Sequence, residues 1–144
     1  MNTIFSSWQF WAFMAAVFAA LTAIFAKIGI TGINSDFATF VRTIVIIAAL
    51  GLFLTVTGQW QDFGVLNGRT GLFLVLSGLA TGASWLCYFR ALQIGQASEV
   101  APIDKLSVVL VAIFAFAFLG ERIPVTHWLG IALIGGGAVL IAAT

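Results

Sequence analysis

The sequence predicts an all-α membrane protein, a bundle of five transmembrane helices, and two observations carry that prediction. Of the 144 residues, 62% are hydrophobic and only 8% are charged, whereas soluble domains carry about 25% charged residues. The mean hydropathy of +1.14 agrees with this. The apolar residues also gather into five runs, each close to the ~20 residues that cross a bilayer as a helix. Transmembrane strands are excluded because the runs are too long and do not alternate.

Short polar breaks separate the predicted spans along the chain. The spans are residues 8–30, 37–57, 71–93, 100–119 and 125–143, and we expect residues 1–144 to form a single domain. Gly120 and Pro124 frame the last break, because glycine suits a helix C-terminus and proline the first turn of the next helix. Four tryptophans fall near predicted span ends, where indole rings favour the membrane interface: Trp8, Trp11, Trp60 and Trp128.

Composition also excludes several classes of protein. A net charge of +1 gives no electrostatic footprint for nucleic acid. Cys87 is the single cysteine and lies in an apolar run, so we expect no disulfide and no metal site. We expect no cofactor and no enzymatic activity. The first 26 residues contain no Lys or Arg, so we expect a retained first span rather than a cleaved signal peptide.

Charged residues are distributed unevenly between the two faces of the membrane. We define side A as the face that carries the first and third connections, and side B as the face that carries the second and fourth. Side B charges lie in loops, where solvent accounts for them. Snorkelling of its long stem explains Lys27 as readily as a function does. Side A charges lie within or beside the spans: Lys27, Asp36, Arg42, Arg90, Glu99, Asp104 and Lys105.

Asp104 is the most informative of these charges. It lies about four residues inside the fourth span, where an Asp costs about 3 kcal/mol at mid-membrane. Intramembrane ionisable residues usually mark functional sites. We do not expect Lys105 to pair with it, because successive residues on a helix do not face each other. Antiparallel packing of the third and fourth spans instead predicts a bridge from Arg90 to Glu99 or Asp104.

A polar cavity on side A accounts for the remaining features. The surplus cations Lys27, Arg42 and Lys105 predict a vestibule that favours zwitterions or anions. Pro102 either begins the fourth helix or leaves the carbonyl of Ser98 without its usual donor beside a cavity. The candidate substrate pathway comprises Lys27, Arg42, Ser84, Trp85, Tyr88, Arg90, Glu99, Asp104 and Lys105, with Pro102 as a helix break.

Short motifs between the end of the third span and the fourth connection suggest a family. They are Ala91, Ala97-Ser98, Val100-Ala101-Pro102 and Gly120-Glu121, within the run YFRALQIGQASEVAPIDKLSVVLVAIFAFAFLGERI from Tyr88 to Ile123. Together with ALTAIFAKIGI at residues 20–30 and the five spans, this run resembles the EamA domain of the drug/metabolite transporter superfamily. The resemblance implies transport of a small metabolite, such as an amino acid or related compound, without ATP. It also implies that a single-domain chain must pair to transport.

The leading functional hypothesis is a secondary transporter in the cell (plasma) membrane, with a small-molecule substrate and the lipid bilayer as its partners. Two alternatives remain open. One is a non-transporting membrane subunit or scaffold, in which the side A charges are structural. The other is a small-multidrug-type cation exchanger, which the first span disfavours because it contains no acidic residue.

Five spans place the two termini on opposite sides of the membrane, so a second copy can supply an inverted repeat. If only the connecting loops are counted, the basic residues are Arg69 and Arg122, and both lie on side B. If residues near the span ends are counted as well, side A has more Lys and Arg than side B. These conflicting counts suit a chain that inserts in both orientations. We therefore expect an antiparallel homodimer, with contacts on the small-residue faces of the fifth and third spans, at Gly135–Gly137 and at Gly78 and Gly82.

Overall fold

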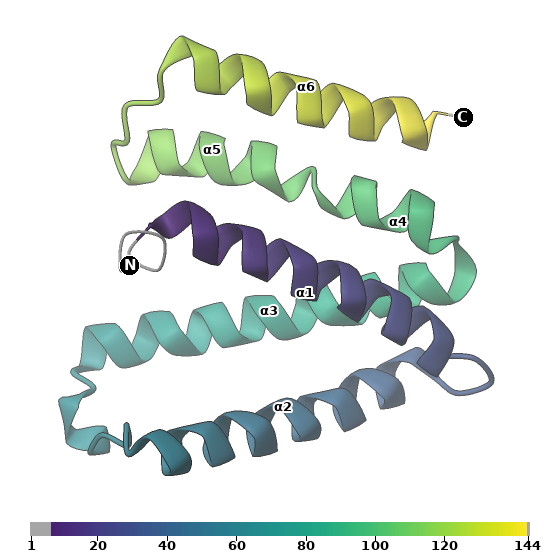
Figure 1. Ribbon diagram of the computed structural model, residues 1–144. Coiled ribbons are helices and arrows are strands. Elements are labelled where there is room, and N and C mark those ends of the chain that lie inside the picture. Colours follow the sequence, from purple (N-terminus) through teal and green to yellow (C-terminus); the bar gives the residue numbers. More distant parts are fainter. Residues whose placement is uncertain (1–6, 144) are drawn as a thin grey trace. The chain divides into compact units, whose positions relative to one another are not determined.

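The computed structural model describes residues 7–143, and that part of the chain is helical and contains no strand. Its elements are α1 (Trp8–Gly29), α2 (Ser35–Thr57), the short 3-10 helix η1 (Phe63–Val65), α3 (Gly68–Ile94), α4 (Ala97–Asp104), α5 (Ser107–Phe118) and α6 (Val125–Ala142) (Figure 1). Within residues 7–143, five segments are long and apolar enough to cross a membrane, with α4 and α5 together forming one of them. The predicted all-α membrane fold is confirmed for the described residues.

Polar residues between the spans determine where the helices begin. The side chain of Asn34 accepts hydrogen bonds from the backbone N–H groups of Asp36 at 2.8 Å and Phe37 at 3.1 Å. This N-cap starts α2 at Ser35, two residues before the predicted span. Asn67 caps α3 in the same way, accepting from the N–H of Thr70 at 2.8 Å. The helices therefore extend past the apolar runs, because caps rather than hydropathy set their first residues.

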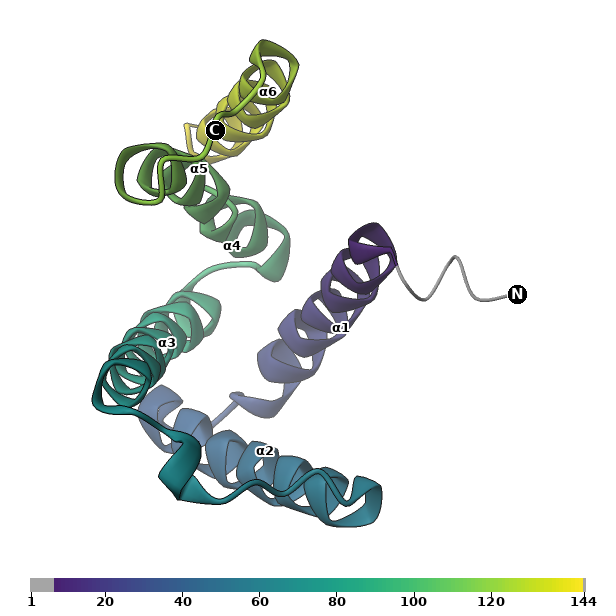
Figure 2. The same ribbon diagram turned by 90° about the vertical axis from the view of Figure 1, so that its left-hand side faces the viewer.

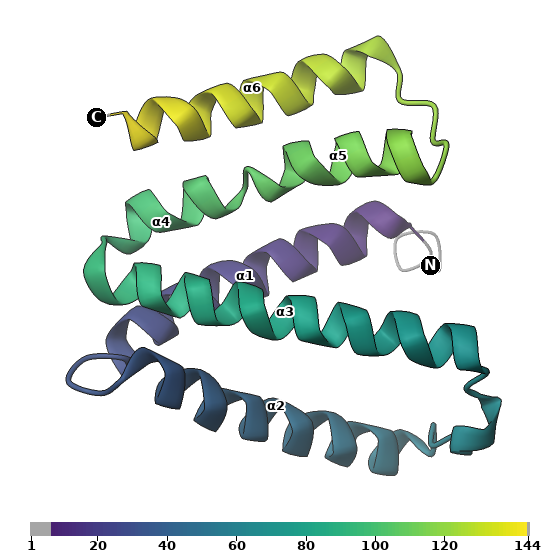
Figure 3. The ribbon, with the colours of Figure 1, turned by 180° about the vertical axis from the view of Figure 1, so that it is seen from behind.

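The fourth predicted span is divided into two helices. Lys105 and Leu106 separate α4 from α5, and the interruption is visible from behind in Figure 3. The N–H of Lys105 bonds the carbonyl of Pro102 at 3.1 Å, and the N–H of Leu106 bonds that of Ile103 at 3.0 Å. These i to i+3 bonds belong to a tighter helical turn. Pro102 lies within α4 and has no N–H to offer the carbonyl of Ser98.

The chain folds as two compact units. The α2–α3 unit comprises residues 25–93, and the α4–α6 unit comprises residues 94–143 together with residues 7–24 of the described chain. In the α4–α6 unit, α6 packs against α4 and α5, and Figure 2 shows α5 and α6 side by side. Small residues permit this approach: Ala112, Ala115, Gly135 and Ala138 are buried there.

The α2–α3 unit has its most buried residues near one end. Phe89 and Leu92 of α3 are 2% and 0% exposed, and Ile30 is 3% exposed. Two polar residues share this region, Ser35 at 0% and Thr39 at 5%. The hydroxyl of Thr39 donates to the carbonyl of Ser35 at 2.9 Å, so its burial leaves no polar group unpaired. Elsewhere most large apolar side chains of the spans are exposed, as expected for surfaces that face lipid tails.

Candidate functional site

Arg42 of α2 packs against two aromatic rings of α3. Its guanidinium carbon lies 4.1 Å from the centre of the Trp85 ring and 5.1 Å from that of Phe89. Trp85 and Phe89 are four residues apart on α3, so their side chains share one face of that helix. A cation over such rings is stabilised by about 0.5–2 kcal/mol. The two aromatic residues therefore hold Arg42 in place without neutralising its charge.

Within residues 7–143, the ion pair joins Asp104 to Lys105. No carboxylate of those residues therefore pairs with Arg42. Arg42 lies seven residues into α2, roughly 10 Å along the helix at 1.5 Å per residue. The rings attract the flat face of the guanidinium, whereas its five N–H donors point outward in its own plane. Those donors match the two oxygens of a carboxylate or phosphate.

Lys27 has a structural partner instead. Its ammonium group donates a hydrogen bond of 2.6 Å to the backbone carbonyl of Leu92. Leu92 lies in the last turn of α3, where carbonyls have no donor from within the helix. A cation there also interacts favourably with the helix dipole. Lys27 thus joins the end of α1 to the end of α3, a role that the sequence left open between snorkelling and function.

A second tertiary contact joins the connection between α1 and α2 to the end of α3. The side-chain amide of Gln93 donates to the carbonyl of Ile33 at 2.8 Å. Together with the bond from Lys27 to Leu92 and the buried Ser35 and Thr39, it gives the side A end of the α2–α3 unit a set of satisfied polar contacts. This end is therefore fixed by hydrogen bonds as well as by apolar packing.

Asp104 and Lys105 form an ion pair at 3.2 Å, with side chains 37% and 54% exposed. The expectation that neighbours could not pair is wrong here. That expectation assumes a regular helix, whereas Lys105 is the residue after α4 and lies in the tighter turn before α5. The long lysine stem can then fold back onto the carboxylate. Asp104 is accordingly neutralised within its own unit.

The remaining sequence candidates lie on α3 and α4. Tyr88 and Pro102 are half-buried, whereas Ser84, Arg90 and Glu99 are exposed. The bridge expected between Arg90 and Glu99 or Asp104 stays a prediction. Of the candidates, the structure brings Arg42 and Trp85 into contact. Sequence reasoning missed Phe89, Leu92 and Gln93. The signal for Phe89 was present, because an aromatic residue four positions after Trp85 lies on the same helical face.

Residues 6–143 match the EamA-like transporter family. A relative from a Sinorhizobium species, described as an uncharacterized transporter in the cobO 3' region, is 60% identical over 136 residues, covering 94% of this chain and 96% of the relative. No solved structure matches the chain.

Other relatives are described as probable 4-amino-4-deoxy-L-arabinose-phosphoundecaprenol flippase subunit ArnE. The one from Proteus mirabilis is 30% identical over 85 residues, covering 58% of this chain and 75% of the relative. The one from Salmonella newport is 34% identical over 73 residues, covering 51% and 62% respectively. The family match covers nearly the whole chain, and the described residues contain five segments apolar enough to span a bilayer. The chain therefore belongs to the EamA-like transporter family, as a multi-pass membrane transporter rather than an enzyme.

Proposed function

We propose that this chain is a secondary transporter of a small metabolite that carries a carboxylate, such as an amino acid or a related compound, and that Arg42 binds this carboxylate. The observation that carries the proposal is the environment of Arg42. Its guanidinium rests on the rings of Trp85 and Phe89 and has no acidic partner among the described residues. A side chain held in this way is already oriented for an anionic ligand.

The energetics favour reversible binding. A lone arginine near the centre of a membrane costs about 2.5–3.5 kcal/mol, and pairing with a carboxylate offsets part of that cost. Charge-assisted hydrogen bonds contribute about 1.5–3 kcal/mol each. Binding of this strength holds a substrate briefly and still permits its release. We propose that Trp85 and Tyr88 line the same path, and that Lys27 acts by holding the ends of α1 and α3 together.

We propose that the chain is one transport domain, half of a ten-helix inverted repeat, that it lies in the cell membrane, and that two copies pair in antiparallel orientation. Support comes from the glycines of α3 and α6: a Cβ atom added at Gly78, Gly82, Gly136 or Gly137 would meet nothing within 4 Å. Helices in lipid associate through such small-residue surfaces, so these positions offer a second copy close backbone contact.

A ligand screen by thermal shift tests the proposal. Purified protein in detergent is heated with amino acids, organic anions or quaternary amines, and the melting temperature is compared among the wild type, Arg42→Gln and Arg69→Gln. We expect a carboxylate ligand to stabilise the wild type and Arg69→Gln but not Arg42→Gln. Arg69 is the control because it is an exposed arginine at the start of α3. Stabilisation by quaternary amines alone would instead favour the cation exchanger.

The relatives named as flippase subunits favour one alternative, in which this chain is one subunit of a transporter for a phosphate-bearing lipid. Arg42 fits a phosphate as well as a carboxylate. The same screen therefore includes undecaprenyl phosphate. Stabilisation by that lipid, with no response to soluble carboxylates, would assign the chain to the lipid-transporting group. No response to any ligand, together with no flux in liposomes, would leave a scaffold as the better description.

A further inference from the structure

The connection between α2 and α3, residues 58–67, is unusually apolar for a loop between two spans. Trp60, Phe63, Val65 and Leu66 are 57%, 77%, 66% and 44% exposed. Asp62 is the one charged residue in this segment. The connection between α5 and α6 differs, because it carries Glu121 and Arg122 in sequence. A loop that projected into water would expose these apolar side chains at a considerable cost.

Hydrogen bonds within the segment satisfy the backbone donors of its last four residues. The N–H of Gly64 bonds the Asp62 side chain at 3.0 Å, and the N–H groups of Val65, Leu66 and Asn67 bond the carbonyls of Asp62, Phe63 and Val65 at 3.0–3.1 Å. From Gly64 to Asn67, every backbone donor is therefore paired inside the loop. The backbone donors of residues 64–67 can therefore leave bulk water without losing hydrogen bonds. Loss of such bonds is the main barrier to placing irregular backbone near lipid.

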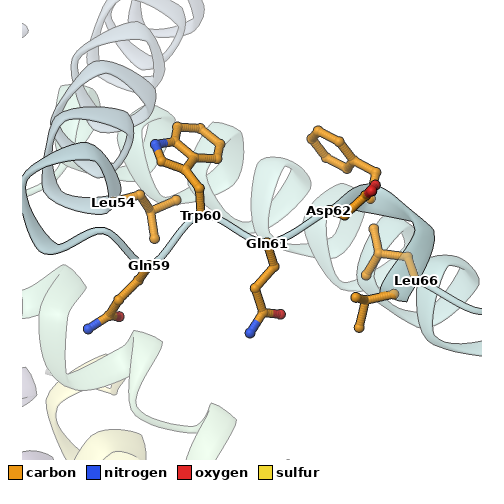
Figure 4. Close-up of a pocket in the computed structure, with 8 residues that line it drawn as sticks. Leu54, Gln59, Trp60, Gln61, Asp62 and Leu66 are labelled. Carbon is orange, nitrogen blue, oxygen red and sulfur yellow. The ribbon is translucent and has the colours of Figure 1, made fainter.

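Trp60 pairs its polar N–H group within the protein and leaves its ring exposed, as tryptophans at a membrane interface can. Its indole N–H donates to the hydroxyl of Thr55 at 3.1 Å, while its ring stays exposed. Figure 4 shows the indole projecting to one side of the extended segment, and Gln59 and Gln61 projecting to the other. This alternation is the ordinary geometry of extended backbone. Between the loop and the last turn of α2 lies a pocket of about 240 Å³. Five apolar residues line it, together with the polar Gln59, Gln61 and Asp62: Leu54, Trp60, Phe63, Val65 and Leu66.

We propose that residues 58–67 lie in the interfacial layer of the bilayer, with Trp60, Phe63, Val65 and Leu66 inserted at the level of the lipid carbonyls and the pocket filled by lipid. Lipid is the expected occupant of the pocket, because the loop is continuous with α2 and α3, which cross the same membrane. The hydrocarbon core is excluded, since irregular backbone is not found exposed to lipid there. With one negative charge and no cation, the segment does not need anionic lipids, and zwitterionic phosphatidylcholine suffices.

Spin-label accessibility tests the placement directly. Cys87 is replaced by Ala, a nitroxide is attached at Phe63→Cys or Val65→Cys, and the protein is reconstituted in phosphatidylcholine vesicles. Power saturation measures how often the nitroxide collides with oxygen, which concentrates in lipid, and how often it collides with a water-soluble nickel chelate. Glu121→Cys is the control, because Glu121 is exposed and lies in the other connection on side B. Two positions are labelled so that one of them still tests the placement if the other variant fails to fold.

We expect oxygen accessibility to exceed nickel accessibility at both loop positions, and the reverse at Glu121→Cys. Nickel accessibility at the loop equal to that of the control would overturn the proposal, because the loop would then be in water. Immobile labels that neither reagent reaches would also overturn it, since a second copy or another protein would cover the loop. A lipid-like response that requires anionic lipid would contradict the proposed lipid class. None of these outcomes depends on whether the chain binds a carboxylate.

Discussion

At the scale of single residues, the cations of the chain have different partners. Lys27 bonds the carbonyl of Leu92, Lys105 pairs with Asp104, and Arg42 rests on two aromatic rings. Sequence reasoning grouped all three as a surplus of positive charge. Contacts distinguish them, because a carbonyl or a carboxylate satisfies a lysine, whereas ring faces leave the donors of an arginine directed elsewhere. Arg42 is therefore the cation best suited to a ligand.

Replacing Lys27 with Met should destabilise the protein by about 1.5–3 kcal/mol, because a buried carbonyl at the end of α3 loses a charged donor. Lys105→Met is the matched control, and it should cost under about 1 kcal/mol because its ion pair is half-exposed. Reversible unfolding in mixed micelles measures both changes. If Lys27→Met kept full stability but lost transport, Lys27 would belong to the substrate path instead of the scaffold.

At the scale of elements, hydropathy identifies the spans, but local hydrogen bonds decide their ends and interruptions. Asn34 and Asn67 start helices before the apolar runs begin. The break at Lys105–Leu106 lies in a run that reads as one span, since a proline removes a single donor without changing hydropathy much. The pairing of Asp104 with Lys105 follows from that break. The sequence predicts a helix break at Pro102, but the interruption lies three residues later, with Pro102 inside α4. Sequence periodicity assumes regular helices, so it could not foresee that shift or the ion pair.

The contact between α5 and α6 gives a prediction at the same scale. A Cβ added at Gly135 would lie 3.0 Å from a methyl carbon of Val109, whereas one at Gly136 would meet nothing within 4 Å. Alanine is favoured over glycine in a helix by about 1 kcal/mol. In the single chain, measured at a detergent-to-protein ratio that separates the copies, Gly136→Ala should therefore raise the unfolding free energy. The unfolding free energy of Gly135→Ala should be lower than that of Gly136→Ala by about 1 kcal/mol or more.

The control for this pair of variants is Val109→Ala, which removes the crowding methyl group. In that background Gly135→Ala and Gly136→Ala should have similar unfolding free energies, measured in the same mixed micelles. A persistent difference would mean that something other than the contact with Val109 disfavours a side chain at Gly135.

At the scale of the whole molecule, family and fold class follow from composition and motif order, whereas the site depends on contacts between distant segments. Trp85 is among the candidates that the sequence offers, but Phe89 and Leu92 look like ordinary apolar residues in the sequence. Their roles arise because Arg42 and Lys27 approach them from other helices. Arg42 and Phe89 are 47 positions apart in the sequence, and Lys27 and Leu92 are 65 positions apart. Contacts between such distant residues leave no local pattern in the sequence.

The antiparallel homodimer predicts labelling from both sides of the membrane. Glu121 is a suitable position for a cysteine, because it is exposed in the connection between α5 and α6. In a Cys87→Ala background, an impermeant maleimide should label Glu121→Cys from each face of sealed cells, in about equal amounts. Labelling from one face alone would indicate a parallel dimer or a different partner chain.

Flux through reconstituted protein is the most direct test of the central claim, that Arg42 binds the anionic group of a transported substrate. Counterflow of the radiolabelled ligand found by the thermal screen is measured in liposomes containing the wild type, Arg42→Lys, Arg42→Gln or Arg69→Gln. Loss of one charge-assisted pairing of about 1.5–3 kcal/mol corresponds to about 10- to 100-fold weaker binding. We predict a loss of that order at low substrate for Arg42→Gln, a smaller loss for Arg42→Lys, and wild-type flux for Arg69→Gln. Undiminished flux in Arg42→Gln, at equal protein content and the same low substrate concentration, would contradict the account.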